Sequence, residues 1–117
     1  VGSEMCIRDS ADFAYALNAW AEPTDPHAAL GDAASAIEGF SSRDELTSFY
    51  ADKTGADLSN LSYYRSFNSF KTACILHGVY ARYRAGQKST EGVDLEMLFA
   101  RIGLSLDSSV AMAADLK

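Results

Sequence analysis

Apolar residues recur at three- and four-residue spacing in four stretches of this chain, the pattern of amphipathic helices. The first stretch begins at Ala11 and is ended by Pro23 and Pro26; its apolar positions are Phe13, Ala14, Leu17 and Trp20 or Ala21. Residues 21–40 carry both prolines and two glycines. We therefore expect a long connection there, holding one short helical turn around residues 27–36.

A second helix is predicted for residues 42–54. Ser42 and Glu45 have the spacing of a capping box, in which each side chain accepts a hydrogen bond from the other residue's backbone N–H. Gly55 stands where a left-handed C-terminal cap is needed. The residues expected to form the buried stripe of this helix are Leu46, Phe49 and Tyr50.

Residues 60–85 are predicted to form the central and most buried helix, because their apolar side chains cover more than one face. Cys74 is interpreted as a small buried thiol, since free cysteine is among the residue types most often buried. The positions expected in the core are Leu61, Tyr64, Phe67, Cys74, Ile75 and Tyr80, with Tyr63, Phe70, Val79 and Tyr83 widening the stripe.

The last predicted helix starts at about Gly92, and Gly103 is the position at which it could be interrupted. Its apolar residues are Leu95, Leu98, Phe99, Ile102, Leu106 and Val110. No run of alternating β-branched residues between turn signals occurs in the sequence, so we predict an all-α fold without a sheet.

The length and the net charge of the chain argue against some classes of function. A chain of 117 residues suits one small domain and is too short for a two-lobed enzyme with separate nucleotide and acceptor sites. The formal net charge of −6 argues against a nucleic-acid partner, which requires clustered cations. Without a long apolar run or a basic-then-apolar N-terminus, we expect no membrane partner and a cytoplasmic location.

The first ten residues match a translated sequencing-library adapter. The adapter bases GTG GGC TCG GAG ATG TGT ATA AGA GAC AG encode Val-Gly-Ser-Glu-Met-Cys-Ile-Arg-Asp and the start of a Ser codon, as in residues 1–10. We therefore interpret residues 1–10 as foreign and residues 11–117 as the native part, truncated at its N-terminus.

Three strings in the native part have a family likeness. Residues 12–23 (DFAYALNAWAEP) resemble "DLAYLLATWxEP", and residues 39–46 (GFSSRDEL), 50–51 (YA) and 54–59 (TGADLS) resemble "GFPSREEL…YA…TGRDLS". Residues 64–87 (YRSFNSFKTACILHGVYARYRAGQ) resemble "YxxFxxFRxAxILxGIYARYxxGQ". The chain thus resembles the C-terminal helical subdomain of the aminoglycoside phosphotransferase family, nearest the branch fused in some proteins to acyl-CoA dehydrogenases.

The resemblance implies a fragment of an ATP-dependent kinase that phosphorylates a hydroxyl of a small molecule. The family's catalytic loop, His-x-Asp followed by Asn, and its metal-binding Asp are absent; the only histidines are His27 and His77, and neither fits. We expect no catalytic, metal or cofactor residue here and no activity of the fragment alone. ATP, Mg²⁺ and the catalytic groups would belong to the missing N-terminal lobes, the fragment's expected partners.

This subdomain walls the acceptor site in the family, so the resemblance implies six candidates for the substrate pocket: Trp20, Tyr64, Phe67, Lys71, His77 and Arg82. The competing interpretation places the aromatic side chains in the core and lets the charged ones reach the surface. A stand-alone acidic helical binding or interaction module is the alternative function, and an acidic regulator that pairs through an amphipathic face is a third.

Overall fold

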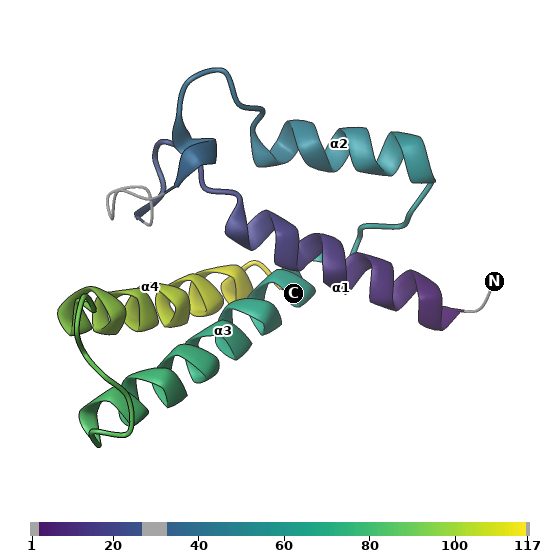
Figure 1. Ribbon diagram of the computed structural model, residues 1–117. Coiled ribbons are helices and arrows are strands. Elements are labelled where there is room, and N and C mark those ends of the chain that lie inside the picture. The colour runs from purple at the N-terminus through teal and green to yellow at the C-terminus, as the bar shows by residue number, and fades with distance from the viewer. Residues whose placement is uncertain (1–2, 27–32, 117) are drawn as a thin grey trace.

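The computed structural model describes residues 3–26 and 33–116, with side chains from residue 9 onward. This part of the chain is helical and contains no strand, which confirms the predicted all-α class. The elements are α1 (Ser3–Ala19), the 3-10 turn η2 (Ala34–Ala36), α2 (Arg43–Thr54), α3 (Leu61–Arg84) and α4 (Leu95–Ala114). In Figure 1, α3 and α4 form an antiparallel hairpin, α1 crosses α3, and α2 lies beyond α1.

Helix α1 begins at Ser3, so the prediction of a start at Ala11 was wrong. Residues 3–10 contain neither Pro nor Gly, and a helix that has formed extends through such residues at little cost. Of the predicted apolar positions, Ala14 and Leu17, and Ala21 just after the helix, are buried, whereas Phe13 is half-buried. Residues 27–32 of the predicted turn lie outside the described part, and η2 accounts for the rest.

Helix α2 has the ends that its sequence predicts. The Oγ of Ser42 accepts a hydrogen bond from the N–H of Glu45 at 3.1 Å, and the Glu45 carboxylate accepts one from the N–H of Ser42 at 3.2 Å. Gly55 caps the other end at φ +68°. The predicted buried stripe was wrong: Leu46 and Tyr50 are half-buried, and the side chain of Phe49 is 63% exposed.

The packing of α3 against α4 reverses the burial that was predicted for α3. The buried residues of α3 are the small or polar Ser66, Asn68, Ser69 and Ala73. Ser66 donates its hydroxyl to the carbonyl of Ser109 on α4, and Ser109 donates to the carbonyl of Ser66, each at 2.8 Å. Small side chains let two helices approach closely, and an aromatic contact between α3 and α4 lies further along the hairpin, where the rings of Tyr80 and Phe99 are 5.5 Å apart.

Other predicted core positions of α3 are exposed. Phe67 is 55% exposed, Phe70 51% and Ile75 57%, and Cys74 is an exposed thiol rather than a buried one. Tyr64 and Tyr80 are half-buried. The helix has the predicted length, but the aromatic stripe that was expected to be its buried part is largely exposed.

Helix α4 runs through Gly103 without the interruption that was considered there. Asp94 caps it by accepting a hydrogen bond from the N–H of Met97 at 3.0 Å. By length and composition, with a mean hydropathy of 1.3, it is the one helix in residues 3–26 and 33–116 that could cross a membrane, and 11% of it is buried. Its contacts with α3 cover one side, while Phe99, Leu106 and Val110 are exposed.

Candidate functional site

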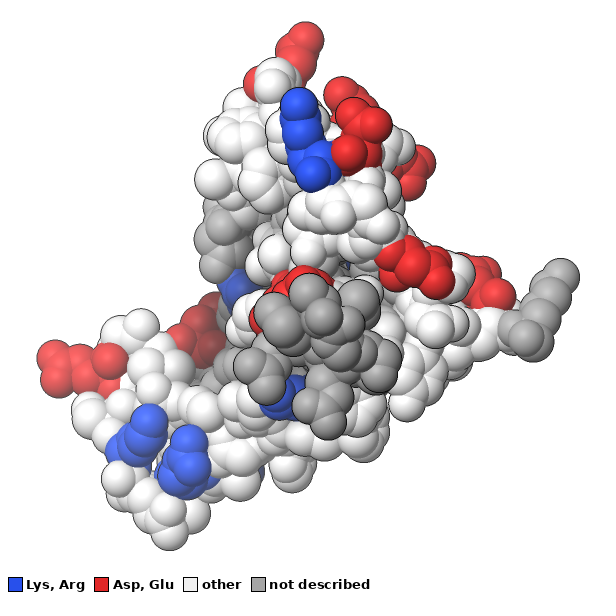
Figure 2. Space-filling view, turned by 90° about the vertical axis from the view of Figure 1, so that its right-hand side faces the viewer, with Lys and Arg blue, Asp and Glu red and all other residues white. Residues whose placement is uncertain are grey.

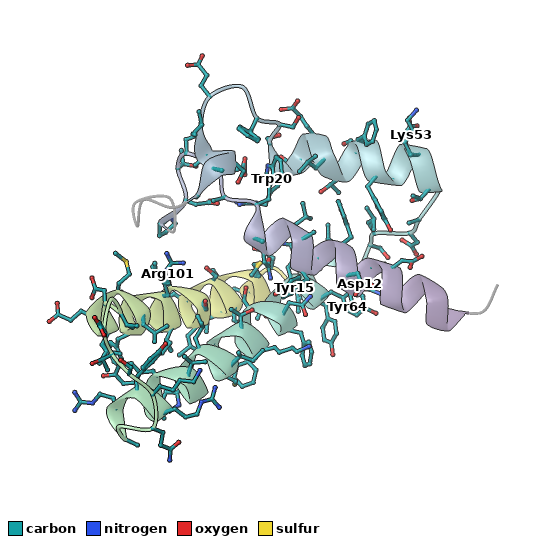
Figure 3. The ribbon with its side chains drawn as sticks, in the orientation of Figure 1. Asp12, Tyr15, Trp20, Lys53, Tyr64 and Arg101 are labelled. Carbon is teal, nitrogen blue, oxygen red and sulfur yellow. The ribbon has the colours of Figure 1, made fainter. Side chains whose placement is uncertain are left out.

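A groove of about 390 Å³ lies between α1 and the first half of α3. Figure 3 shows Asp12 and Tyr15 of α1 close to Tyr64 of α3. Three of the six predicted pocket residues, Tyr64, Phe67 and Lys71, line it together. The complete lining is Ala11, Asp12, Tyr15, Tyr63, Tyr64, Phe67, Asn68 and Lys71.

The floor of this groove is held by a hydrogen bond between its two helices. The buried side chain of Asn68 donates from Nδ2 to the carbonyl oxygen of Ala11 at 3.0 Å. A carbonyl group inside a helix already accepts one backbone bond, and its second lone pair is free for such a contact. This bond fixes α1 across α3 at the position where Asp12 and Tyr15 face the aromatic residues of α3.

The wall of the groove is aromatic and its polar groups are few. The rings of Tyr63 and Tyr64 meet edge to face with centroids 5.3 Å apart. Tyr15 and Phe67 complete the aromatic lining, which offers apolar faces together with phenol hydroxyls. Such a surface can hold a ligand with an apolar or planar part and orient it through a few hydrogen bonds.

Two charged groups of opposite sign belong to the same lining, the carboxylate of Asp12 and the ammonium of Lys71. A carboxylate can accept hydrogen bonds from hydroxyl or ammonium groups of a ligand, and an ammonium group can donate to anionic or hydroxyl oxygens. Within the described residues no three His, Cys, Asp or Glu side chains gather as a metal site would require. The groove is therefore suited to binding and orienting a ligand.

A second, more polar cavity of about 320 Å³ lies beside the first, and Tyr15 lines both. Asn18 of α1 donates from Nδ2 to the carbonyl of Arg65 at 2.9 Å and accepts from Nε of Arg65, also at 2.9 Å. Burial lowers the pKa of Arg65. None of the six predicted residues lines this cavity, which adds polar groups from α4, among them Arg101 and Ser105.

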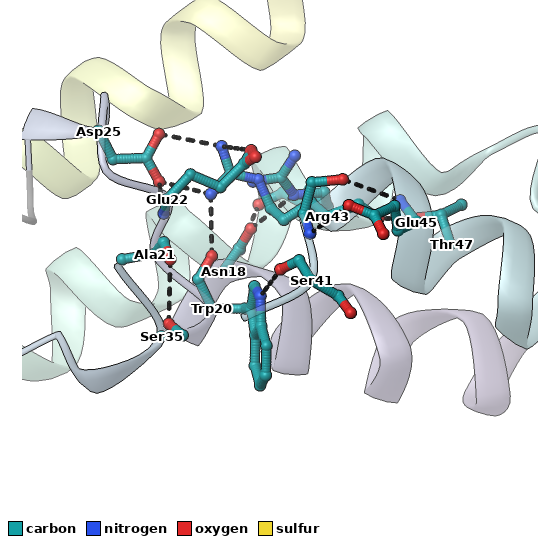
Figure 4. Close-up of polar contacts among 12 residues, drawn as sticks. Asn18, Trp20, Ala21, Glu22, Asp25, Ser35, Ser41, Arg43, Glu45 and Thr47 are labelled. Carbon is teal, nitrogen blue, oxygen red and sulfur yellow. Dashed lines mark hydrogen bonds and ion pairs between the residues drawn. The ribbon is translucent and has the colours of Figure 1, made fainter. Parts of the chain in front are cut away.

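Trp20 has a different position from the one expected of a pocket residue. Its indole N–H donates to the carbonyl of Ser41 at 2.7 Å, and its ring meets Phe40 edge to face at 5.7 Å. Its carbonyl oxygen accepts from Arg43 at 2.9 Å. Figure 4 shows the polar contacts of Trp20 at the junction of α1 with the start of α2, and Trp20 is outside the lining of the groove.

Arg43 forms the charged part of the same junction. Its guanidinium binds both carboxylate oxygens of Asp25, and it lies 3.1 Å from Glu22. The hydrogen bond to Asp25 raises the pKa of Arg43, and the nearby carboxylates add to the shift. Because a guanidinium binds a carboxylate with two parallel hydrogen bonds, this contact fixes where α2 begins relative to α1.

The remaining predicted residues are not in the groove. His77 and Arg82 are exposed on the second half of α3, two to three helical turns beyond Lys71 at 3.6 residues per turn. His27 lies outside the described residues. The sequence reasoning missed Asp12, Tyr15, Tyr63 and Asn68 as groove residues, and the only signal for the first two was their place on a helix that carries the family-like string.

Comparisons of this chain with protein-family models, with curated proteins and with solved structures find no match.

Proposed function

We propose that this chain is the C-terminal helical subdomain of a cytoplasmic, ATP-dependent phosphotransferase, and that the groove between α1 and α3 forms part of its acceptor site. The observation that supports the proposal most is the grouping of Tyr64, Phe67 and Lys71 in one groove. These are three of the six residues that the family resemblance implies as acceptor contacts.

The side chains that line the groove are of the kinds that can bind a small-molecule acceptor. In phosphoryl transfer the protein mainly positions the reactants and stabilises charge, so the acceptor needs a surface that orients its hydroxyl group. The aromatic residues would hold the apolar part of the acceptor, and Lys71 would bind an anionic or hydroxyl-bearing group of it. Nucleotide, Mg²⁺ and the catalytic carboxylates would come from the N-terminal lobes.

The coding sequence upstream of Ala11 provides the first test. Genomic DNA that is sequenced across this point, with the adapter removed, should encode a His-x-Asp loop and an Asp followed by Trp or Phe, within the length of a catalytic subdomain. A long upstream reading frame that contains neither element would contradict the phosphotransferase proposal.

A kinetic experiment on the protein encoded by the complete gene would test the groove itself. We expect this protein to transfer labelled phosphate from ATP to one of a panel of antibiotics, choline-like amines and sugars. Replacing Tyr64→Ala should raise the KM for that acceptor by about tenfold while the KM for ATP stays unchanged. Phe49→Ala is a matched control, because Phe49 is exposed on α2, away from the groove. An unchanged acceptor KM in a folded Tyr64→Ala protein would remove the groove from the acceptor site.

A stand-alone interaction module is the second candidate, and the exposed aromatic side chains of α3 favour it. Contiguous apolar surface on a small domain often marks a place where another protein binds. A start codon directly upstream of the Ala11 codon would favour this module over the phosphotransferase.

A further inference from the structure

One exposed face of α3, next to the face that packs on α4, presents an uninterrupted uncharged row, which we name the outer seam. Its residues follow one another at spacings of four and three and are all exposed: Tyr63, Phe67, Phe70, Cys74, His77 and Ala81. The three aromatic residues Tyr63, Phe67 and Phe70 are 54%, 55% and 51% exposed. This alternation is the spacing of a coiled-coil contact line, which is filled when a second helix packs along it.

The charges of α3 indicate what kind of helix would fit. Arg65, Lys71, Arg82 and Arg84 are basic, and no Asp or Glu occurs anywhere in this helix. The whole chain has a net charge of −6, and these four residues are four of its ten Lys and Arg residues. Figure 2 shows two basic side chains at the lower left of the visible face, and others near the centre and at the top beside acidic ones.

The cations flank the seam rather than interrupt it. Lys71 follows Phe70 and Arg82 follows Ala81, which places both on the same flank of the helix, and both are exposed. In paired helices, the charges of the residues beside the apolar contact line determine which partner helix binds, because opposite charges attract and like charges repel. A helix with Glu or Asp beside its apolar residues would bring opposite charges to Lys71 and Arg82.

We propose that the outer seam of α3 is a docking surface for an amphipathic helix of a partner protein, and that this helix carries acidic residues beside its apolar ones. If α3 of a second copy packed on the seam, its own Lys and Arg residues would meet Lys71 and Arg82, and no opposite charges would be paired. The net charge of the chain likewise disfavours approach to an anionic lipid surface. This inference does not depend on the phosphotransferase proposal.

The experiment uses the full chain and two synthetic three-heptad peptides. Both have Leu at the two contact positions of every heptad; one has Glu and the other Lys at all flanking positions, so the peptides differ only in the sign of their charge. Like charges keep each peptide from pairing with itself. We expect fluorescence anisotropy to show that the Glu peptide binds at least about tenfold more tightly, with a preference that shrinks at ~1 M salt.

Variants separate the seam from other surfaces. Phe70→Ser should abolish binding of the Glu peptide, and the double variant Lys71→Glu with Arg82→Glu should reverse the preference in favour of the Lys peptide. Phe49→Ser, at an aromatic residue of α2 that is 63% exposed, should leave binding unchanged. Tyr63, Phe67 and Lys71 belong to both the groove and the seam with its flank. Phe70 lies on the seam alone and Tyr64 in the groove alone, so Phe70→Ser and Tyr64→Ala test the two proposals separately.

Three results would overturn the proposal. The first is equal binding of both peptides or binding of neither. The second is self-association of the chain in sedimentation experiments that Phe70→Ser abolishes, which would make a second copy the occupant. The third is tighter binding of vesicles containing phosphatidylserine than of the Glu peptide, since that would identify a membrane as the partner.

Discussion

The two sides of α3 carry opposite kinds of side chain. The side that packs on α4 is built from small residues such as Ser66 and Ala73, which are 9% and 2% exposed. The neighbouring face carries Phe67 and Phe70, which are more than half exposed. Hydrophobicity alone predicts the reverse arrangement. In this hairpin the buried residues of α3 are small or polar ones, and Phe67 and Phe70 remain exposed for other contacts.

The largest expected effect comes from enlarging a side chain on the packed side. Ala73→Leu should lower the free energy of unfolding by about 1–3 kcal/mol, because the interface with α4 has no room for three more carbons. Urea denaturation followed by circular dichroism would measure it. Cys74→Leu is the matched control: it introduces the same side chain at the next, exposed residue and should change stability by less than about 0.5 kcal/mol. Equal losses in both variants would show that the two sides do not differ as described.

A smaller effect is expected from the paired serines between α3 and α4. Ser66→Ala removes the hydroxyl that donates to the carbonyl of Ser109 at 2.8 Å. A hydrogen bond of this kind contributes about 0.5–1.5 kcal/mol, so the free energy of unfolding should fall by that amount. Ser48→Ala, on the exposed side of α2, corrects for the higher helix propensity of Ala. Should Ser66→Ala and Ser48→Ala have the same effect, the serine pair would contribute nothing to the packing.

The smallest effect is expected on the aromatic side. Phe67→Ala should lower the free energy of unfolding by less than about 1 kcal/mol, far below the 3–5 kcal/mol typical of a buried Phe. Leu17→Ala on α1 is the contrasting control, because Leu17 is 2% exposed and its truncation should cost about 2–5 kcal/mol. A loss of several kcal/mol for Phe67→Ala in the same denaturation experiment would place the aromatic row in the core after all.

The candidate groove could be predicted only in part. Tyr64, Phe67 and Lys71 lie on successive turns of one helix, so one family-like string contains all three and was enough to propose them together. Asp12 and Tyr15 are about fifty residues away in sequence and reach the groove because α1 crosses α3 there. The hydrogen bond from Asn68 to Ala11 stabilises the crossing of the two helices, and no pattern in the sequence predicts this hydrogen bond.

The features that the sequence determined by itself are local ones. The ends of α2 follow from Ser42, Glu45 and Gly55, because a cap depends on residues within one helical turn. The inner positions of α1 follow from the spacing of Ala14 and Leu17, and the all-helical class follows from the absence of strand patterns.

The tertiary structure alone decided which side of α3 is buried. Apolar residues surround this helix, so periodicity offers more than one side for the core. The paired hydrogen bonds between Ser66 and Ser109 of α4 mark the side that packs, where Ser69 and Ala73 of α3 and Ile102 and Ser105 of α4 are buried. Such complementarity belongs to two helices at once, and the pattern of either one does not contain it.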